Sequence, residues 1–511
     1  MNMTKSLILG SAAALLAMGG AQAADLPLKA KAVEYVRICS LYGAGFYYIP
    51  GTDTCIKLGG YVRADVSLGG GDYGLMSGVN QGSNNRLTNY WFQRSRTDLT
   101  VDTRTATEYG VVRTYSDLVF TVDSATVSGS PTTTFAGGTA GLGMYHAFIQ
   151  FAGFTFGRTY SIFDTPWQSY PAGGPDTIPG GSNHVTGVNQ VAYTADFGQG
   201  ITGSIALDDE TTAANGQSNL WNVNGFAAAG SVSGAGVVTV TPAAAVAGAA
   251  FVTGTYGTNS WGGTRSPDIV GALRVDQAWG LAQLSVAAHD MHPSFYGASE
   301  VTGHPSDKWG FAIQGGLSIK NIPTGPGDTI NMNAVYTDGA THYNFQSLFP
   351  QTISIYSGSG IGAYQSLGIA GLSDGVFGTG TGIDTVKTWG FRGGYTHNWN
   401  PNWASAIYGG YAQLRYGGTG KALICANFAA IANAGATCNP DFNFAVIGVN
   451  TVWTPVKNLA FTADVNWSHL DQKYSGTINA PAVAAAAKPA ATYELKDQNS
   501  FSMLLRAQRN F

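Results

Sequence analysis

The chain has little charge and, beyond its first residues, no long apolar run. Only 11% of its 511 residues are charged, whereas a typical soluble domain is about 25% charged. Its mean hydropathy is only +0.01, which is far too low for a membrane protein built of helices. The Ala-rich stretches at 243–250 and 482–487 are short and are flanked by Pro or Gly. This balance fits a transmembrane barrel, whose strands alternate lipid-facing and water-facing residues and average near zero.

Motifs of enzyme chemistry are also lacking. The eight histidines form no HExxH, and no Ser, His and acid set has a spacing that indicates a barrel enzyme. Gly69-x-Gly71-x-x-Gly74 matches the dinucleotide fingerprint as text, but it opens a long polar loop and no βαβ unit follows. Lys421 follows Gly420 without a Walker motif around it. We therefore predict that the chain is not an enzyme and uses no cofactor.

One pair of histidines has a spacing that metal sites use. His289 and His292 are spaced HxxH, with Asp290, Glu300 and His304 nearby. A surface site for a divalent ion is the alternative to exposed loop histidines. We interpret these histidines as exposed loop residues and predict no metal site.

The first 23 residues read as a secretory signal peptide. Lys5 precedes an apolar stretch at 7–18, and Ala21-Gln22-Ala23 is a small-x-small cleavage site. The alternative is a short membrane anchor, but a spanning helix needs about 20 apolar residues. Removal of Lys5 with the signal peptide would leave 25 of the 26 basic residues against 30 acidic ones, a net charge of −5. This mild charge argues against nucleic acid as a partner.

Four cysteines lie in two local pairs, Cys39 with Cys55 and Cys425 with Cys438. An even number in an exported chain predicts structural disulfides. Each would close a loop of about 13–16 residues, which the chain-entropy model values at roughly 3 kcal/mol. Metal ligation and a redox pair are the competing readings, and no CxxC or His-rich neighbour supports either.

Alternating apolar and polar residues predict an all-β fold, a 16-stranded antiparallel transmembrane β-barrel over residues 55–511 that follows a periplasmic-side segment at 24–54. In the first strand, Leu58 and Val62 lie on one face and Arg63 and Asp65 on the other. The apolar face should meet lipid and the polar face water. The predicted strands are 55–68, 89–104, 108–121, 141–152, 153–160, 188–197, 200–209, 267–277, 280–290, 307–320, 328–338, 384–397, 402–416, 441–454, 459–471 and 499–511.

Seven short and eight long connections alternate between these strands. Outer-membrane barrels have short periplasmic turns and long extracellular loops, so both termini should be periplasmic. Trp399, Trp403, Trp453 and Tyr395 lie near turns, where an interfacial aromatic girdle belongs. A barrel of sixteen strands is too wide for side chains to fill, so an aqueous channel should remain.

Two segments resemble known outer-membrane proteins. The last strand, 499–511, ends on Phe511 and resembles the closing strand of a bacterial outer-membrane barrel. The segment 34–63, which reads EYVRICSLYGAGFYYIPGTDTCIKLGGYVR, resembles the general porins of alphaproteobacteria, of the Brucella, Rhizobium and Bradyrhizobium type. The resemblance implies a multi-pass outer-membrane homotrimer, in contact with lipid and lipopolysaccharide, that passes ions and small hydrophilic solutes passively. It also implies that the third long loop folds into the lumen and narrows it.

That constricting loop should run from about 161 to 187. It contains Asp164 and Asp176, and carboxylates at a narrow point attract cations. The opposing wall should be basic: Arg63 and Arg113 lie mid-strand, and Arg94 and Arg96 share one face, so we predict the constriction residues Arg63, Arg94, Arg96, Arg113, Asp164 and Asp176. The alternative is a scatter of solvated wall charges.

Three other functions stay open. A solute-specific channel, for example one selective for sugars, would line its lumen with aromatics, and Trp167 and Tyr170 lie in the predicted loop. A surface adhesin would need rigid, patterned loops in place of Gly/Ser/Ala-rich ones. A barrel enzyme would need a convergent catalytic set.

Overall fold

The computed structural model describes residues 37–69, 84–88, 90–124, 139–167, 178–213, 216, 218–223, 248–297, 299–346, 348–358 and 360–511. The predicted signal peptide therefore lies outside the described residues and stays a prediction. No helix in the described part of the chain is long and apolar enough to cross a membrane.

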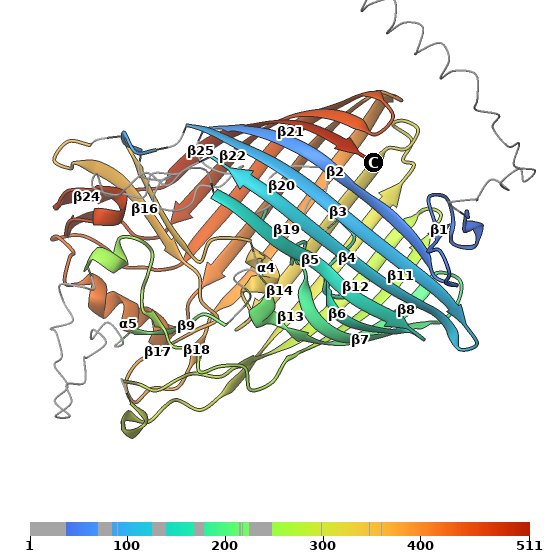
Figure 1. Cartoon of the computed structure of the whole chain (residues 1–511). Helices are drawn as coiled ribbons and strands as arrows, with labels where there is room; N and C mark the ends of the chain where they lie inside the picture. Colours follow the sequence, from blue (N-terminus) through green and yellow to red (C-terminus); the bar gives the residue numbers. More distant parts are fainter. Residues whose placement is uncertain are drawn as a thin grey trace, which may run out of the picture.

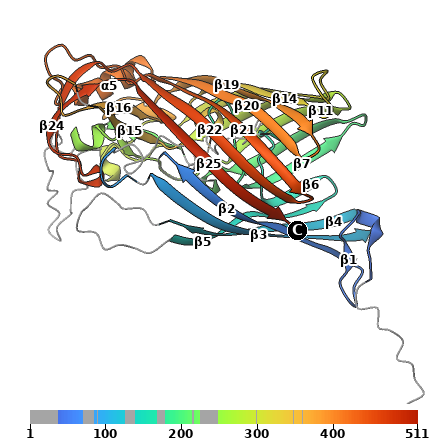
Figure 2. The ribbon, with the colours of Figure 1, turned by 90° about the horizontal axis from the view of Figure 1, so that it is seen from above.

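Sixteen antiparallel strands among these residues form a closed barrel (Figures 1 and 2). Each strand pairs with its neighbours in chain order, and the first barrel strand also pairs with the last, which closes the ring. All sixteen predicted strands are confirmed. They are β2 (Cys55–Leu68), β3 (Trp91–Thr107), β4 (Gly110–Asp123), β5 (Thr139–Phe151), β6 (Phe154–Thr159), β7 (Val188–Asp196), β8 (Ile201–Asp209), β11 (Asp268–Gln277), β12 (Gly280–Met291), β13 (Lys308–Lys320), β14 (Thr329–Asp338), β19 (Lys387–Asn400), β20 (Trp403–Arg415), β21 (Phe442–Val456), β22 (Leu459–Gln472) and β25 (Gln498–Asn510).

The two faces of the strands differ as the alternation predicts. Val62 is 53% exposed and Phe501 is 67% exposed on the outer face, whereas Arg63, Asp65 and Ser502 are buried on the inner face. Neighbouring residues of a strand point to opposite faces, so one register places most of the apolar residues of these strands outside. The wall is therefore apolar toward lipid and polar toward the lumen.

Links between successive barrel strands alternate in length, from two to eight residues at one end and from 15 to 58 residues at the other. The turn at Ala152-Gly153 has positive φ angles of 49° and 86°, the pattern of a two-residue type I′ hairpin turn. Near the short turns, Trp403 stacks on Trp453 at 5.7 Å between ring centroids. Exposed tryptophans at this level form the predicted girdle.

The long links build a folded layer at their end of the barrel (Figure 1). It contains the sheet β9 (Leu220–Asn222), β10 (Thr258–Asn259), β17 (Gly375–Phe377) and β18 (Asp384–Thr385), the sheet β15 (Thr352–Ser357), β16 (Gln365–Gly371), β23 (Gly476–Ala480) and β24 (Ala491–Leu495), and the helices α4 (His342–Phe345) and α5 (Gly418–Phe428). A continuous apolar core that includes Trp221, Phe251 and Tyr256 lies beneath these elements. The predicted disulfide Cys425–Cys438 is confirmed here. The loops are thus more regular than their Gly- and Ala-rich composition suggested.

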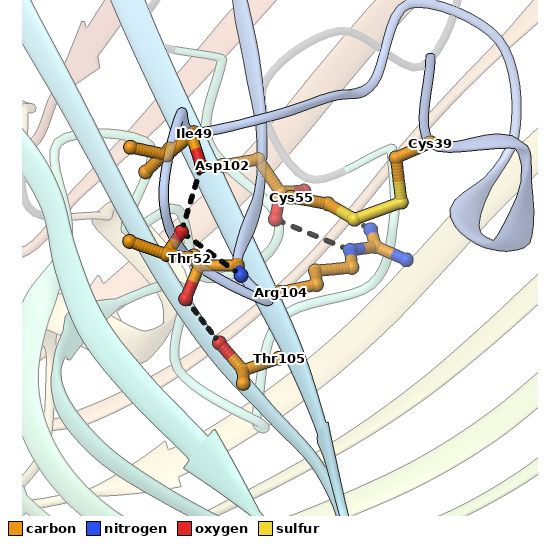
Figure 3. The surroundings of a disulfide bond; sticks show 8 residues. Cys39, Ile49, Thr52, Cys55, Asp102, Arg104 and Thr105 are labelled. Atoms are coloured by element: carbon orange, nitrogen blue, oxygen red, sulfur yellow. Dashed lines mark hydrogen bonds and ion pairs between the residues drawn. A yellow bond between two sulfur atoms is a disulfide. The ribbon is translucent and has the colours of Figure 1, made fainter. Parts of the chain in front are cut away.

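The N-terminal segment is attached at the opposite end. The short strand β1 (Tyr47–Tyr48) pairs with β2, and the predicted disulfide Cys39–Cys55 is confirmed (Figure 3). Below it, the guanidinium of Arg104 lies 5.0 Å from the Phe46 ring centroid and donates to Asp102 at 3.0 Å. The disulfide and these contacts fix the segment to the start of the barrel wall.

Candidate pore constriction

Two described limbs of the link between β6 and β7 contact the inner wall of the barrel. These limbs are residues 160–167 and 178–187. In the first limb, Phe163 is fully buried. It belongs to an apolar cluster with small side chains that point inward from six consecutive barrel strands, Ala192, Ala206, Val270, Ala287, Ala312 and Val335. Small residues at one level of the wall leave room for an aromatic ring to lie flat against it.

Polar side chains of the far wall hold the backbone of this limb. Gln314 Nε2 donates to the Phe163 carbonyl at 3.0 Å, and Gln283 Nε2 donates to the Asp164 carbonyl at 2.9 Å. The Trp167 indole donates to Asn333 Oδ1. These bonds satisfy backbone and indole groups that would otherwise be buried without a partner, which is costly.

The second limb is held by an arginine that the sequence analysis missed. Arg392 of β19 is 1% exposed. Its Nη2 donates to the Ser182 carbonyl at 2.6 Å and its Nη1 to the Ile178 carbonyl at 3.4 Å. The backbone N–H of Gly180 donates to the Asn344 carbonyl at 2.9 Å. Both limbs are therefore bonded to the barrel wall, and the second limb is also bonded to the loop that carries α4.

Inward-facing glycines make this close approach feasible. A Cβ atom on Gly316 would clash with Thr165, and one on Gly410 would clash with the Pro179 carbonyl. A Cβ on Gly390 would lie 3.0 Å from Gly180 Cα. The wall is flat where the loop is seated because these three positions lack side chains.

Asp164 joins the two limbs of the loop. Its Oδ2 accepts from the backbone N–H of His184 at 2.6 Å, its Oδ1 lies 3.0 Å from His184 Nδ1, and His184 Nε2 lies 3.1 Å from Glu210 Oε2. Burial alone would lower the pKa of His184, but the carboxylates of Glu210 and Asp164 outweigh it and raise that pKa well above its ordinary value. The two carboxyl groups therefore favour the charged form of His184. The second predicted carboxylate, Asp176, lies outside the described residues.

The loop begins beside the wall of β4 and β5. The Tyr160 and His146 rings lie 4.4 Å apart. Burial, together with Asp117 and Asp164, raises the pKa of Tyr160 to about 12, so the phenol stays protonated. Ser161 follows and donates to Asp208 Oδ2 at 2.6 Å.

Two of the predicted wall arginines face each other. Arg63 and Arg96 are direct partners across β2 and β3. Arg63 Nε lies 3.4 Å from Asp65 Oδ2, and Arg96 Nε donates to Thr121 Oγ1 at 3.0 Å. The structure thus brings these two cations together on the inner wall.

The other two arginines are bound by carboxylates. Arg94 donates to both oxygens of Asp123, at 2.6 and 2.7 Å. Arg113 Nη2 lies 2.9 Å from Asp102 Oδ2, which Arg104 also contacts at 3.0 Å. Arg113 is opposite Arg104, so it lies nearer to the turn end than the predicted mid-strand position. The reason is that β4 begins at Gly110.

The prediction of exposed loop histidines is wrong for His289. This residue is buried at the end of β12, and its Nδ1 lies 2.7 Å from Asp268 Oδ1. His289 lies inside the predicted strand 280–290, close to its end, where exposure is expected if nothing covers the strand. In the structure, Ser218 covers it, with Oγ 2.5 Å from His289 Nε2. His292 contacts Asp307 at 2.8 Å and is only partly buried.

The anchors of the loop carry a sequence signal that was not used. Gln283, Gln314, Asn333 and Arg392 all lie on the polar face of predicted strands. In particular, Arg392 alternates with the outward Trp389 and Phe391. Which of the many inward polar residues contact the loop depends on pairing across the barrel, and no local pattern encodes that.

Comparisons with known proteins agree with this architecture. The family model described as "Porin subfamily" matches residues 25–504. Porin Omp2b of Brucella suis biovar 1 and Porin Omp2b of Brucella canis are each 40% identical to the chain over 210 residues, which is 40% of this chain and 53% of the relative. The chain thus spans about half the length of the curated relatives it matches.

A solved structure has the same fold. The outer membrane channel DcaP of Acinetobacter baumannii is 16% identical, with a TM-score of 0.53 over 91% of this chain and 99% of that one. The predicted resemblance to the alphaproteobacterial porins is confirmed by the family match and the Brucella relatives. The protein is a multi-pass β-barrel of the outer membrane, and the chain belongs to the porin subfamily.

Proposed function

We propose that the chain forms a passive aqueous channel that lets ions and small hydrophilic solutes cross the outer membrane, with no chemistry of its own. The family and the closed barrel with a polar inner wall support this proposal. The observation that carries it is the contact of the two described limbs of the loop, 160–167 and 178–187, with Arg392, Gln314 and Asn333 of the inner wall. A barrel of sixteen strands is too wide for side chains to fill, so a loop bonded to its inner wall would narrow the lumen and leave it open.

We infer that the predicted charges set the ion preference of this narrow part. Arg63 and Arg96 are direct partners on the inner wall, with Asp65 3.4 Å from Arg63, while Arg94 is paired with Asp123. Arg113 contributes less, because it is bonded directly to the Asp102 carboxylate, which it shares with Arg104 and which offsets part of their combined charge. Asp164 acts mainly by holding His184, and Asp176 remains a predicted constriction residue.

Charge substitutions test this assignment. Replacing Arg96 by Gln should raise cation over anion permeability, whereas replacing Arg113 by Gln should change it less. The measurement is the reversal potential in a salt gradient. Equal shifts for the two variants would contradict the ranking of the arginines.

The channel function itself is tested by swelling of liposomes that contain the purified protein. Neutral solutes of increasing size should enter at decreasing rates, because passage depends on fit to the lumen. Protein-containing liposomes that swell no faster than empty ones would refute the proposal. Equal rates for solutes of one size but different chemistry separate a general channel from a solute-specific one.

A solute-specific aromatic track receives no support from Trp167. Its indole is bonded to Asn333 and its side chain is buried against the wall, so it is not free to stack on a passing sugar. Tyr170 lies outside the described residues.

The surface-adhesin reading gains one observation. The long loops form two four-stranded sheets over an apolar core, which is the rigid patterning that an adhesin would need. We therefore keep adhesion as a second function of this layer. Cells that carry the protein should bind a host surface or matrix more than cells without it, and equal binding would dismiss the adhesin reading.

We also propose a homotrimer, on family grounds and because an apolar outer wall can serve as a subunit interface. Chemical cross-linking of the detergent-purified protein should stop at three chains. A product that stops at one chain would contradict the trimer.

A further inference from the structure

A buried cluster of metal-ligand side chains lies where three elements of the long-loop end meet. Asp268 begins β11, His289 lies near the end of β12, and His342 begins α4. Each residue offers one ligand atom, and these three atoms all lie within 4.8 Å of one another. All three residues are buried. They are far apart in sequence, so no motif spacing could reveal them.

His342 is the unusual member of this cluster. It is 7% exposed, and neither ring nitrogen has a hydrogen-bond partner among the described residues. Its Nε2 points at oxygens that lie beyond hydrogen-bond reach, Asp268 Oδ2 at 3.8 Å and Glu210 Oε2 at 3.7 Å. A buried imidazole with no partner costs free energy, and an ion between these atoms would remove that cost.

The other two side chains are already oriented by their neighbours. Asp268 Oδ1 lies 2.7 Å from His289 Nδ1, and Asp268 Oδ2 accepts from the Tyr343 hydroxyl at 2.7 Å. His289 Nε2 lies 2.5 Å from Ser218 Oγ. Metal-binding histidines and carboxylates are characteristically held by outer partners of this kind.

We propose that Asp268, His289 and His342 bind one divalent transition-metal ion of the zinc class. Two imidazoles and one carboxylate are a recurrent zinc set, in which a water or a further side chain completes four ligands. Glu210 is close enough to His342 to balance the charge of the ion. Tetrahedral zinc holds its ligand atoms roughly 3.3 Å apart. On binding, His342 Nε2 would therefore move closer to Asp268 Oδ2, from which it lies 3.8 Å away, and Asp268 Oδ1 and His289 Nδ1, which lie 2.7 Å apart, would separate.

A small cavity adjoins two of the proposed ligands, Asp268 and His289. It has a volume of about 20 Å³, and its lining includes Asp268, His289, Trp261, Thr264 and Ser266. That volume holds about one water molecule, since a water needs roughly 10–15 Å³ by the same measure. Because 261–266 belong to a long link, the ion enters from the long-loop end.

The ion would fasten the support of the constricting loop. His342 stands beside Tyr343, whose ring lies 4.5 Å from the ring of Phe163. Glu210 in turn contacts His184. Metal bound at this cluster therefore joins the start of β11, the end of β12 and α4 directly behind the seat of the loop.

The test uses the full chain, extracted from outer membranes in detergent, stripped with chelator and then given Zn²⁺ alone. We expect one tightly held zinc per chain, measured by metal analysis after removal of free ion. Co²⁺ in its place should give the visible absorption of a four-coordinate site. The matched control is His469→Ala, which removes a histidine of β22 that contacts Asn499 and should keep the zinc.

Two variants complete the design. His342→Ala should weaken zinc binding by more than about 100-fold, the upper range for loss of an outer partner, whereas Tyr343→Phe should weaken it roughly 10- to 100-fold. If His342→Ala does not fold, Tyr343→Phe decides alone. Wild-type protein with no more zinc than His342→Ala, or a Tyr343→Phe protein with unchanged affinity, would overturn the proposal and leave a hydrated polar cluster.

Discussion

Replacing Arg392 by Met removes the charged anchor of the constricting loop and keeps much of its volume. Arg392 donates to the Ser182 carbonyl at 2.6 Å and to the Ile178 carbonyl at 3.4 Å. The Ile178 carbonyl keeps a second donor, Gln346 Nε2 at 3.1 Å, so the main loss is at Ser182. A hydrogen bond from a charged donor contributes about 1.5–3 kcal/mol.

This loss sets the expected size of the effect. If seating of the loop weakens by about 2–3 kcal/mol, the fraction of unseated loops rises between about 30- and 140-fold, since 1.4 kcal/mol is tenfold. The remaining anchors, including Gln314 and Asn333, keep the loop seated most of the time. We therefore expect an almost unchanged mean conductance with frequent brief excursions to higher current.

Single-channel recording in a planar bilayer measures both quantities. The matched control is Arg274→Met, which removes the same charge from an exposed arginine that pairs with Asp276 at 3.2 Å. It should record like the wild type. If Arg392→Met is as quiet as Arg274→Met, the arginine does not hold the loop and the account of its seat is wrong.

Three further predictions concern a glycine beneath the loop, the N-terminal disulfide and His184. Gly316→Val should push Thr165 off the wall and raise conductance or current noise. The control Gly315→Val, whose added Cβ meets nothing within 4 Å, should not. Similar recordings for the two variants would show that the loop does not need a glycine at position 316. Replacing both Cys39 and Cys55 by Ser should remove up to about 3 kcal/mol of stability, seen as a lower temperature of heat modification on gels, and an unchanged temperature would contradict it. The pKa of His184 is raised in the folded protein, so its charged form stabilises the seated loop fully below the ordinary pKa of about 6.5, and this stabilisation is lost as pH rises through the higher folded value. Current noise should therefore grow at alkaline pH. Constant noise would contradict this role of His184.

The barrel could be predicted from the sequence because each strand carries its own signal. The alternation of Val62 with Arg63, or of Phe501 with Ser502, is a local property that survives in the structure unchanged. The same local reading gave both disulfides, since each pair is separated by only 16 or 13 positions.

The seat of the loop could not be predicted in this way. Gln314 and Phe163 are 151 positions apart, and Arg392 and Ser182 are 210 apart. Their contact depends on the curvature of the closed barrel and on small residues across six strands. The histidine cluster fails for the same reason, because His342 reaches His289 only through the fold of a long link.

The central claim is that the lumen is open and is narrowed by the loop 160–187. Single-channel conductance of the detergent-purified wild type, recorded under a salt gradient, tests it most directly. The account predicts stable steps near a nanosiemens that close in three equal levels under voltage, with a reversal potential that gives the ion preference. A folded, heat-modifiable barrel that conducts no current would contradict it.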